Sequence, residues 1–399
     1  MKRCGIGYAI VYIKELKTLI YLDHAASSWP KPPEVAKAVY DTLTNCGANP
    51  GRGSHQMAVQ AGRICFEARK QIARLLHVRN PNDIAFTMNT TMALNLAILG
   101  VVEAGDHVIC TQLEHNSVRR PLERLKREKN VTLTYVEADE KGMVHPSEVE
   151  KAIQPHTKLI VCNHSSNLLG SILPLEAIGE IAQKHGVLLL VDAAQTIGTI
   201  PIDVTALHID MLAFPGHKGL LGPQGTGGLY IGPHVDLKPL LYGGTGSQSE
   251  AIDQPSVRPD RYESGTPNTP GLAGLAEGVK YVLKQGEETI HEMEWELTQM
   301  TIAELSALPQ VEVLGPARGE PRTGIVSFNV KGADSSEIAY ILDRHYEIAV
   351  RSGYHCTPLA HEAARTKEWG AVRASFGAFS TSHDAEQLIQ AVKQLVKHY

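Results

Sequence analysis

Short apolar runs alternate with amphipathic helical patterns through the middle of the chain, and this alternation is the strongest constraint on the fold. Four of the runs end abruptly in polar residues: "HVIC" before "TQLEHNS", "KLIVC" before "NHSSN", "GVLLLV" before "DAAQ", and "IDMLAF" before "PGHK". Among them lie the helical patterns "SVRRPLERLKREK", "PSEVEKAIQ" (146–154) and "PLEAIGEIAQKHG". Buried strands that alternate with amphipathic helices predict an α/β fold with a mainly parallel sheet, covered by helices on both faces.

The polar clusters at the ends of these runs predict a single site. In parallel α/β sheets, ligands bind beyond the carboxyl ends of the strands, and each cluster follows such an end. We therefore expect side chains from four strands to converge there, namely His115, Asn163, Asn167, Asp192 and Lys218. Four clusters at one edge support a site better than any of these residues does alone.

The pattern changes near "ESGTPNTPG" (263–271), where we place a linker. Beyond it, helical patterns lead to the short strands "VEVL" and "GIVSFNV", and the chain closes with the helix "HDAEQLIQAVKQLVKHY". This succession is typical of a smaller α+β lobe. We therefore expect a large domain over residues 19–265 and a small C-terminal α+β domain over residues 266–399.

Charge and cysteine usage exclude several classes of protein. The net charge of −5 is mild and no run of basic residues is present, so nucleic acid is not an expected partner. The six cysteines are scattered without C-x-x-C spacing, which favours reduced thiols in a cytoplasmic protein over a disulfide framework or a zinc site. No apolar stretch approaches the roughly 20 residues of a membrane span, and the charged residues Lys14, Glu15 and Lys17 interrupt any signal-peptide pattern. We expect a soluble cytoplasmic protein with no membrane partner.

One lysine lies in an apolar, glycine-rich turn. Residues 214–227 read "FPGHKGLLGPQGTG", so Lys218 has His217 on one side and Gly-Leu-Leu-Gly on the other. A lysine in surroundings of low polarity loses proton affinity and becomes an amine nucleophile or a Schiff-base former. The alternative is a lysine whose ammonium group reaches solvent from the turn.

Asp192 stands at the end of the predicted buried strand "GVLLLV". A carboxylate there needs a partner, because an unpaired buried charge is costly. The protonated pyridine nitrogen of pyridoxal 5'-phosphate (PLP) is one such partner, and an acidic partner makes PLP an electron sink. A helix N-cap before "AAQTIG" is the other interpretation. The occurrence of Lys218 one strand later favours the cofactor.

A phosphate site is predicted at the start of a helix. Asn89, Thr90 and Thr91 precede an apolar helical run, and hydroxyl groups with free backbone N–H groups at a helix start suit a phosphate. Ordinary helix capping is the alternative. The sequence contains neither G-x-x-x-x-G-K-[ST] nor G-x-G-x-x-G, which argues against a nucleotide-driven or dinucleotide enzyme.

Two further residues suggest reaction chemistry. His115 directly follows a predicted strand, where it could stack on an aromatic cofactor and move protons. Cys356, in "RSGYHCTPLAH", has Arg351 five residues before it, and a nearby cation favours the reactive thiolate over the inert thiol of a structural cysteine. His355 and His361 could complete a metal site with Cys356, but no second pair with ligand spacing supports one, so we expect no metal.

Together these residues resemble the class V aminotransferase family of fold-type I PLP enzymes, and within it the cysteine desulfurases and selenocysteine lyases. The likeness runs from "YLDHAASSWPKP" (21–32) almost to the C-terminus. Its markers occur in the order of the family: "NPGRGSH", "NTTMALN", "LEHNS", "SSNLLG", "VDAAQ", "GHK", "ESGTPNTPG", "RSGYHC" and "RASFGAF". The resemblance implies a large PLP-binding domain with a mainly parallel sheet of seven strands, whose first residues pack with the small domain. Residues 1–18 precede the usual start of the family and are interpreted as an N-terminal extension, with a misassigned start codon as the alternative.

The resemblance also implies how PLP would be bound. Lys218 would hold the cofactor covalently while Asp192 pairs with its pyridine nitrogen. Gln195 would contact the ring hydroxyl, and His115 would stack on the ring. The phosphate would be held by Thr90, Thr91 and His217.

The remaining implied roles concern the substrate and a second subunit. Asn167 and Arg373 would bind the substrate carboxylate, which an arginine fork suits geometrically. Thr266 would reach the phosphate of the neighbouring subunit, so a homodimer with shared sites follows. Cys356 occupies the position of the sulfur-accepting cysteine, and its short "R-x-G-x-H-C" form is closest to the branch that includes selenocysteine lyases.

One residue departs from the family pattern. The desulfurases usually have serine before "GHK", where its hydroxyl helps to hold the phosphate, whereas this chain has Pro215. Proline offers neither a side-chain donor nor a backbone N–H. One phosphate contact is therefore missing, and the chain resembles a side branch of the family.

We therefore expect a PLP-dependent cysteine desulfurase that converts L-cysteine to L-alanine and leaves a persulfide on Cys356. Lys218 would act as the base, His115 as an acid, and the sulfur would pass to an acceptor protein or a reductant. The alternatives within the family are a selenocysteine lyase and a class V aminotransferase acting on a different small amino acid. A non-catalytic PLP-binding scaffold would have no need of Lys218, Asp192 and Cys356 together, and a hydrolase would need a signature that the chain lacks.

Overall fold

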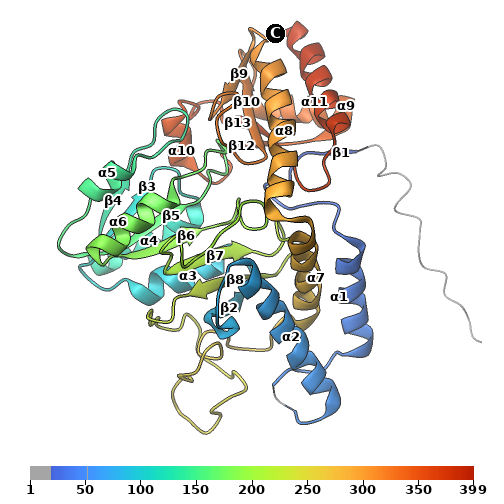
Figure 1. The fold of residues 1–399 in the computed structure, drawn as a ribbon. Coiled ribbons are helices and arrows are strands. Elements are labelled where there is room, and N and C mark those ends of the chain that lie inside the picture. Colours follow the sequence, from blue (N-terminus) through green and yellow to red (C-terminus); the bar gives the residue numbers. More distant parts are fainter. Residues whose placement is uncertain (1–18, 52) are drawn as a thin grey trace, which may run out of the picture.

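A seven-stranded sheet forms the centre of the larger lobe in the computed structural model, which describes residues 19–51 and 53–399 (Figure 1). In sheet order its strands are β2 (Ile84–Thr87), β8 (Gly227–Ile231), β7 (Met211–Pro215), β6 (Leu188–Asp192), β5 (Thr157–Asn163), β3 (His107–Thr111) and β4 (Thr132–Val136). Neighbouring strands are parallel except that β8 runs antiparallel to both β2 and β7. The predicted α/β fold with a mainly parallel seven-stranded sheet is confirmed. The predicted extension at 1–18 lies outside the described residues.

Helices cover both faces of this sheet, as predicted. The helices of this lobe are α1 (Pro33–Asn45), α2 (Gln56–Leu75), α3 (Thr90–Val101), α4 (Asn116–Lys129), α5 (Pro146–Lys151), α6 (Leu175–His185) and α7 (Thr269–Gln285), with a short 3-10 helix at Pro81–Asp83. Helix α1 packs on α7 rather than on the sheet itself. Within β5, Ile160 and Cys162 belong to the buried cluster that includes α2, α6 and α7, while Leu159 and Val161 belong to the cluster with α3 and α4. Successive side chains of a strand point to opposite sides of the sheet. A strand that is buried on both sides is therefore apolar at every position of its sequence.

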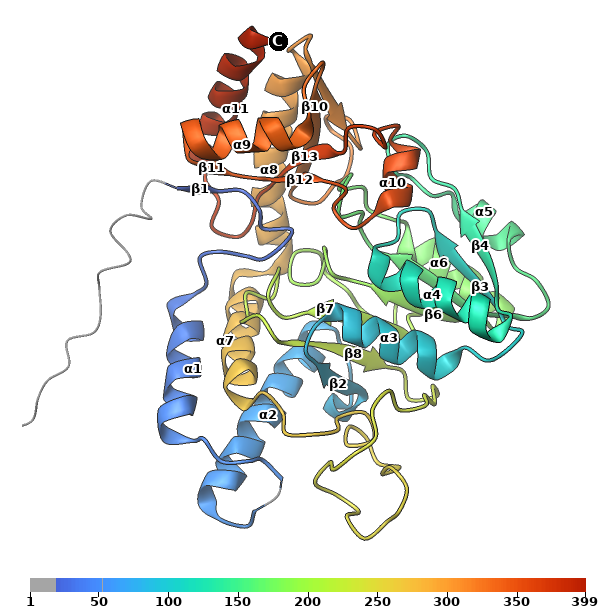
Figure 2. The same cartoon turned by 180° about the vertical axis from the view of Figure 1, so that it is seen from behind.

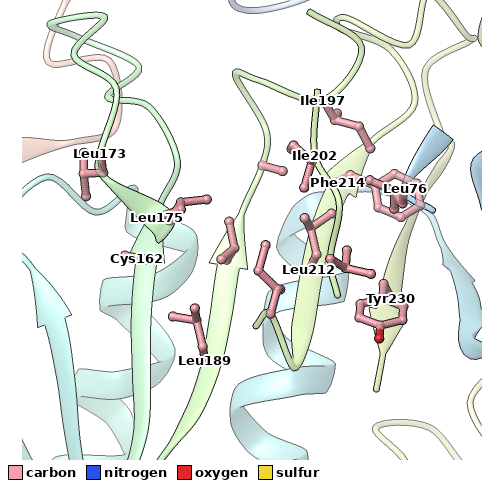
Figure 3. Close-up of a cluster of buried hydrophobic side chains, with 14 of the residues drawn as sticks. Leu76, Cys162, Leu173, Leu175, Leu189, Ile197, Ile202, Leu212, Phe214 and Tyr230 are labelled. Carbon is pink, nitrogen blue, oxygen red and sulfur yellow. The ribbon is translucent and has the colours of Figure 1, made fainter. Parts of the chain in front are cut away.

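Figure 3 shows part of the first of these clusters. Leu189, Leu212 and Phe214 point from neighbouring strands to the same side of the sheet, where Ile197 and Ile202 lie over them. All five side chains are almost completely buried. Truncating one of them to alanine removes apolar contacts that a rigid core cannot replace, at a cost of about 2–5 kcal/mol. This core holds the strands whose polar ends carry the candidate site.

The upper lobe in Figures 1 and 2 contains a four-stranded antiparallel sheet. Its strands, in order, are β12 (Arg351–Gly353), β13 (Ala371–Ser375), β10 (Ile325–Val330) and β9 (Val311–Leu314). Its helices are α8 (Glu287–Ser306), α9 (Ser335–Tyr346), α10 (Pro358–Ala363) and α11 (Ser382–Leu395), followed by a 3-10 turn at Val396–His398. Near the start of the described chain, β1 (Ile20–Tyr21) pairs in parallel with β11 (Ile348–Ala349), so the N-terminal strand joins this lobe.

The division of the chain after residue 265 stays a prediction. Helix α7 follows that point in sequence, yet its apolar residues Leu272, Leu275 and Val279 belong to the buried cluster of the large sheet. Helices α1 and α2 pack beside it (Figure 1). A boundary at Gly286, where α7 ends and α8 begins, would separate the two cores more cleanly.

The element boundaries show where local patterns suffice. Strand β9 begins and ends at the predicted residues, whereas α5 ends at Lys151 rather than at residue 154. Pro155 explains this early end, because a proline restricts the residue before it to extended conformations. In the part of the chain that the structure describes, no helix has the length and apolar composition needed to cross a membrane.

Candidate active site

A cavity of about 230 Å³ lies at the carboxyl ends of the central strands. Its lining includes residues that follow β2, β3, β5, β6 and β7, joined by side chains from the small sheet. Eleven of the residues predicted from sequence line it: Asn89, Thr90, Thr91, His115, Asn163, Asn167, Asp192, Gln195, His217, Lys218 and Arg373. The predicted convergence at this edge is what the structure shows, although the roles of the individual residues stay predictions.

Lys218 lies in a tight turn directly after β7. Ser28 donates a hydrogen bond from Oγ to the carbonyl oxygen of Lys218 (2.8 Å), and Lys31 Nζ donates one to the carbonyl oxygen of His217 (2.9 Å). The next residue must be glycine, because a β-carbon at Gly219 would collide with the carbonyl oxygen of Ile197. Burial, helped by the positive charge of Arg373, lowers the pKa of Lys218 to about 8. At pH 7 roughly a tenth of the amine is then deprotonated, which is the form that a nucleophile or a base requires and a far larger share than an ordinary lysine has.

Asp192 ends β6 and faces the same cavity. Its Oδ1 accepts a hydrogen bond from the backbone N–H of Ala194 (3.0 Å). The residues that follow form turns and not a helix, so the alternative prediction of a helix N-cap is wrong. Burial raises the pKa of Asp192, while this hydrogen bond and Lys218 oppose the rise. Gln195 lies in the following turn and donates from Nε2 to the carbonyl oxygen of Ala25 (3.1 Å).

The predicted phosphate end combines a helix start with a histidine. Thr90 and Thr91 are the first residues of α3, where backbone N–H groups have no partner inside the helix, and the Asn89 side chain accepts from Met92 N (2.9 Å). Burial, followed by the charge of Lys218, lowers the pKa of His217 to about 4, so its imidazole is neutral near pH 7. A neutral ring, two hydroxyl groups and free amides form a donor-rich end suited to a phosphate.

Arg373 is held rigidly at the opposite end. It donates from Nη1 to the carbonyl oxygen of Asn167 (2.8 Å) and from Nη2 to Asp23 Oδ1 (3.0 Å). Asn167 in turn donates from Nδ2 to the carbonyl oxygen of His355 (2.6 Å). These bonds preorganise a cation and an amide for an anionic group, which is the chemistry expected of a carboxylate site.

Cys356 lies beside the cavity on a short, anchored turn between β12 and α10. Its carbonyl oxygen accepts a hydrogen bond from Asn116 N (2.8 Å), and its Sγ lies 3.7 Å from Nη2 of Arg351, which lines the cavity. The backbone at Cys356 has φ of 61°, a left-handed conformation that a non-glycine residue adopts only when its surroundings impose it. Among the described cysteines, Cys46, Cys110 and Cys162 are buried, Cys65 is half-buried, and Cys356 alone is exposed.

Thr266 does not lie in this cavity. It is exposed, and its Oγ1 accepts a hydrogen bond from Asn49 Nδ2 (3.3 Å). It lines a different cavity of about 490 Å³ together with the exposed side chains of Met88 and Leu241. Within one chain, Thr266 is therefore not grouped with the other predicted residues.

Sequence reasoning missed three contributors to the site. Arg351 was noted only as a neighbour of Cys356, and Ser117 and Asp23 were not singled out. Ser117 carries a local signal, since a hydroxyl two residues after a helix-capping residue is well placed to contact it. Asp23 carries none, because its partner Arg373 is 350 positions away.

Four buried polar atoms in this cavity have no hydrogen-bond partner among the described residues. They are His217 Nδ1, Asn163 Oδ1, Asn167 Oδ1 and Arg373 Nε. Unpaired buried polar groups cost roughly 1–3 kcal/mol each, so their clustering in one cavity indicates a polar ligand. Donors at the helix start, an amine on Lys218 and a carboxyl on Asp192 match the phosphate, aldehyde and ring nitrogen of PLP.

A smaller cavity of about 40 Å³ lies on another side of Lys218 and is lined by Glu294 from α8. The Glu294 side chain is only 6% exposed, and burial raises its pKa to about 8, well above the ordinary value near 4.5. Between about pH 4.5 and pH 8, the folded protein therefore keeps the proton on Glu294, whereas the unfolded chain has released it. The contribution of Glu294 to the free energy of unfolding is greatest below about pH 4.5 and is lost as the pH rises towards about 8.

We expect Glu294→Gln to remove this pH dependence, since glutamine keeps the shape of the protonated acid without ionising. Relative to the parent, the variant should gain up to about 4 kcal/mol of unfolding free energy between pH 5 and pH 8.5, at about 1.4 kcal/mol per pKa unit. Urea unfolding at both pH values measures the difference. Glu292→Gln, an exposed position on the same helix, is the matched control. Equal pH dependence in the parent and Glu294→Gln would show that Glu294 is ionised in the folded protein.

Comparison with known proteins places this arrangement in a family. The sequence matches the family model "Aminotransferase class-V" over residues 20–388. A relative named "Probable cysteine desulfurase" from Methanothermobacter thermautotrophicus is 37% identical over 389 residues, covering 95% of this chain and 95% of the relative. A relative of the same name from Pyrococcus abyssi is 37% identical over 387 residues, covering 95% and 94%.

Solved structures agree with this assignment. The chain superposes on the apo structure of cysteine desulfurase from Thermococcus onnurineus NA1 with a TM-score of 0.90. The two sequences are 36% identical, and the match covers 96% of this chain and 95% of that one. The likeness therefore spans both lobes and the cavity between the strand ends and the small sheet.

Proposed function

Because the chain belongs to the aminotransferase class-V family, we propose that it is a cysteine desulfurase, which removes sulfur from L-cysteine and yields L-alanine and a persulfide on Cys356. The observation that carries the proposal is the position of the exposed Cys356 beside a cavity that contains Lys218 and Asp192. An aminotransferase needs the lysine and the aspartate but has no use for an anchored, exposed thiol beside them. The names of the relatives support the same choice.

PLP is the cofactor that we propose for the cavity. When bound, it would supply an electron sink that stabilises the negative charge left by removal of a substrate α-proton. Lys218 would hold it covalently, Asp192 would face its ring nitrogen, Gln195 its ring hydroxyl and His115 its ring face. The phosphate would lie at the start of α3, near Thr90, Thr91 and His217. Pro215 lines the cavity as well and adds no donor there.

The chain's own residues can carry out two steps, the removal of the substrate α-proton and the transfer of the substrate sulfur. Lys218, with its lowered pKa of about 8, can accept the substrate α-proton on Nζ near neutral pH. Arg373 and Asn167 would meanwhile hold the substrate carboxylate, which fixes the amino acid in one orientation. Cys356 Sγ then attacks the substrate sulfur: an S–S bond forms and the Cβ–S bond breaks. The electron pair of that bond passes to the three-carbon fragment, which gains protons and leaves as alanine.

The exposure of Cys356 supports transfer of its outer sulfur to an acceptor protein or a reductant. A location in the cytoplasm remains part of the proposal and rests on the scattered, unpaired cysteines.

We also propose a homodimer. Thr266, exposed in one chain, lines a large cavity with Met88 and Leu241, which are 61% and 49% exposed. Apolar side chains gathered around a cavity are typical of a surface that a partner covers. A second copy there would bring Thr266 to the phosphate of its neighbour. A mass of twice 43.4 kDa by light scattering supports this, and a monomer with full activity contradicts it.

The test of the function is a product balance on the purified protein. With PLP and L-cysteine, we expect a visible absorption band from the bound cofactor and equal amounts of L-alanine and sulfide when a reductant is present. A parallel assay with L-selenocysteine shows which of the two amino acids the enzyme prefers as its substrate. Turnover of selenocysteine alone would make the protein a selenocysteine lyase. A bound cofactor with transamination and no sulfide would overturn the desulfurase proposal, and a protein that cannot bind PLP would overturn the cofactor as well.

A further inference from the structure

His115 is both a lining residue of the cavity and the N-cap of α4. Its Nδ1 lies 3.1 Å from the backbone nitrogen of Ser117 and 2.9 Å from Ser117 Oγ. A backbone N–H can only donate, so Nδ1 must accept and carries no proton. The hydrogen of the neutral ring is therefore on Nε2.

The direction of the neighbouring hydrogen bonds follows from this assignment. Since Nδ1 accepts, the hydroxyl of Ser117 must be the donor in its bond to His115. A hydroxyl has only one hydrogen, so in the 2.8 Å contact between Ser117 Oγ and Thr91 Oγ1 the donor is Thr91. The chain of donors thus runs from Thr91 at the start of α3, through Ser117, to His115.

We propose that Ser117 is a positioning residue that locks His115 as the neutral tautomer with its proton on Nε2. His115 would then act as a fixed hydrogen-bond donor towards the bound ligand and not as an acid that cycles through the imidazolium form. The part of this proposal that concerns the ligand rests on the proposed function, whereas the tautomer does not. It also replaces the role of proton-donating acid that the sequence suggested for His115.

The surroundings of His115 favour the neutral ring. A proton on Nδ1 would point at the N–H of Ser117 and break both bonds that Nδ1 accepts. Burial is the largest reason why the pKa of His115 falls to about 4, and the charges of Lys218, Arg351, Arg120 and Arg373 lower it further. An imidazolium ion would be an additional cation among four others.

The deduced direction also affects the phosphate end. The hydroxyl hydrogen of Thr91 is committed to Ser117, so Thr91 would contact a phosphate through its backbone N–H at the start of α3. Together with Pro215 in place of a donor, this shifts phosphate binding from side-chain hydroxyls towards backbone amides and His217.

Nitrogen-15 NMR of the histidine-labelled full chain, with and without PLP, tests the tautomer directly. The His115 signal is identified by its loss in His115→Asn. We expect a neutral ring with the proton on Nε2 from pH 5.5 to 8 in both forms. Ser117→Ala should raise the pKa of His115 by about 0.5–1 unit and increase exchange between tautomers, because one hydrogen bond to Nδ1 is lost.

Two variants separate positioning from mere packing. Ser117→Thr keeps a hydroxyl and should retain the parent signal. Ser165→Ala removes a cavity hydroxyl that contacts Thr323 and not His115, so it should leave the His115 signal unchanged. A His115 that titrates near its ordinary pKa of about 6.5, or a proton found on Nδ1, would overturn the proposal. The NMR result is independent of cysteine turnover, so a failed product balance with the expected tautomer would refute only the proposed function.

Discussion

Cys356→Ala is expected to lower sulfide release from L-cysteine by more than about 10³-fold while leaving the absorption band of bound PLP intact. The reason is geometric: among the described residues, Cys356 is the only exposed cysteine, and its Sγ lies 3.7 Å from an arginine that lines the cavity. Without the thiol no nucleophile remains to accept the substrate sulfur. Sulfide and alanine are measured separately under single- and multiple-turnover conditions.

Cys65→Ala is the matched control for this prediction. Cys65 is half-buried, contacts Thr269 Oγ1 at 3.8 Å, and lines the cavity that contains Thr266 rather than the candidate active site. Burial raises the pKa of its thiol, which makes it a poor nucleophile. Sulfide release that survives in Cys356→Ala, or that falls equally in Cys65→Ala, would contradict the assignment of Cys356.

Lys218→Ala is expected to lower turnover by at least about 10²–10⁴-fold, which is the usual contribution of a positioned general base, and to abolish covalent retention of PLP. Both effects have one cause, because the same amine, with its pKa lowered to about 8, would hold the cofactor and accept the α-proton. Mass spectrometry after borohydride reduction measures covalent retention, and the assay of alanine and sulfide measures turnover.

Lys218→Arg separates charge from chemistry. Arginine keeps the positive charge beside Asp192 but does not release its proton near neutral pH. We expect it to bind PLP without a covalent link and to be as inactive as Lys218→Ala. If a variant of Lys218 still retained PLP covalently after borohydride reduction, a different amine would hold the cofactor. Lys31, whose pKa is lowered by burial to about 8, would be the first residue to examine.

Much of the fold could be predicted because its signals are local. Strand β9 has the predicted limits, because the spacing of apolar residues along a short segment indicates which of its faces is buried. The candidate site was predicted for a similar reason: each polar cluster directly follows a strand, and parallel strands end at the same edge. The resemblance to a known family then supplied roles that spacing does not contain.

The parts that were missed depend on residues far apart in the chain. The packing of α7 against the large sheet was not apparent, because its pattern is that of any amphipathic helix and the choice of lobe depends on which surface is left uncovered. Thr266 lies away from the other predicted residues, and its proposed role depends on a second chain. The contact of Ser117 with His115 carries a local signal, but its contact with Thr91 joins the starts of two different helices and has none.

The alternation of strands and helices, the polar strand ends and the position of Lys218 in a glycine-rich turn follow from the order of residues alone, because a strand or a turn is specified by neighbours in sequence. Which charges meet was decided by the tertiary structure. Arg373 is held by Asp23 from the other end of the chain, and Cys356 rests on the start of α4 through Asn116. Such contacts form only when the packing of two lobes closes long loops, and short-range patterns carry no record of them.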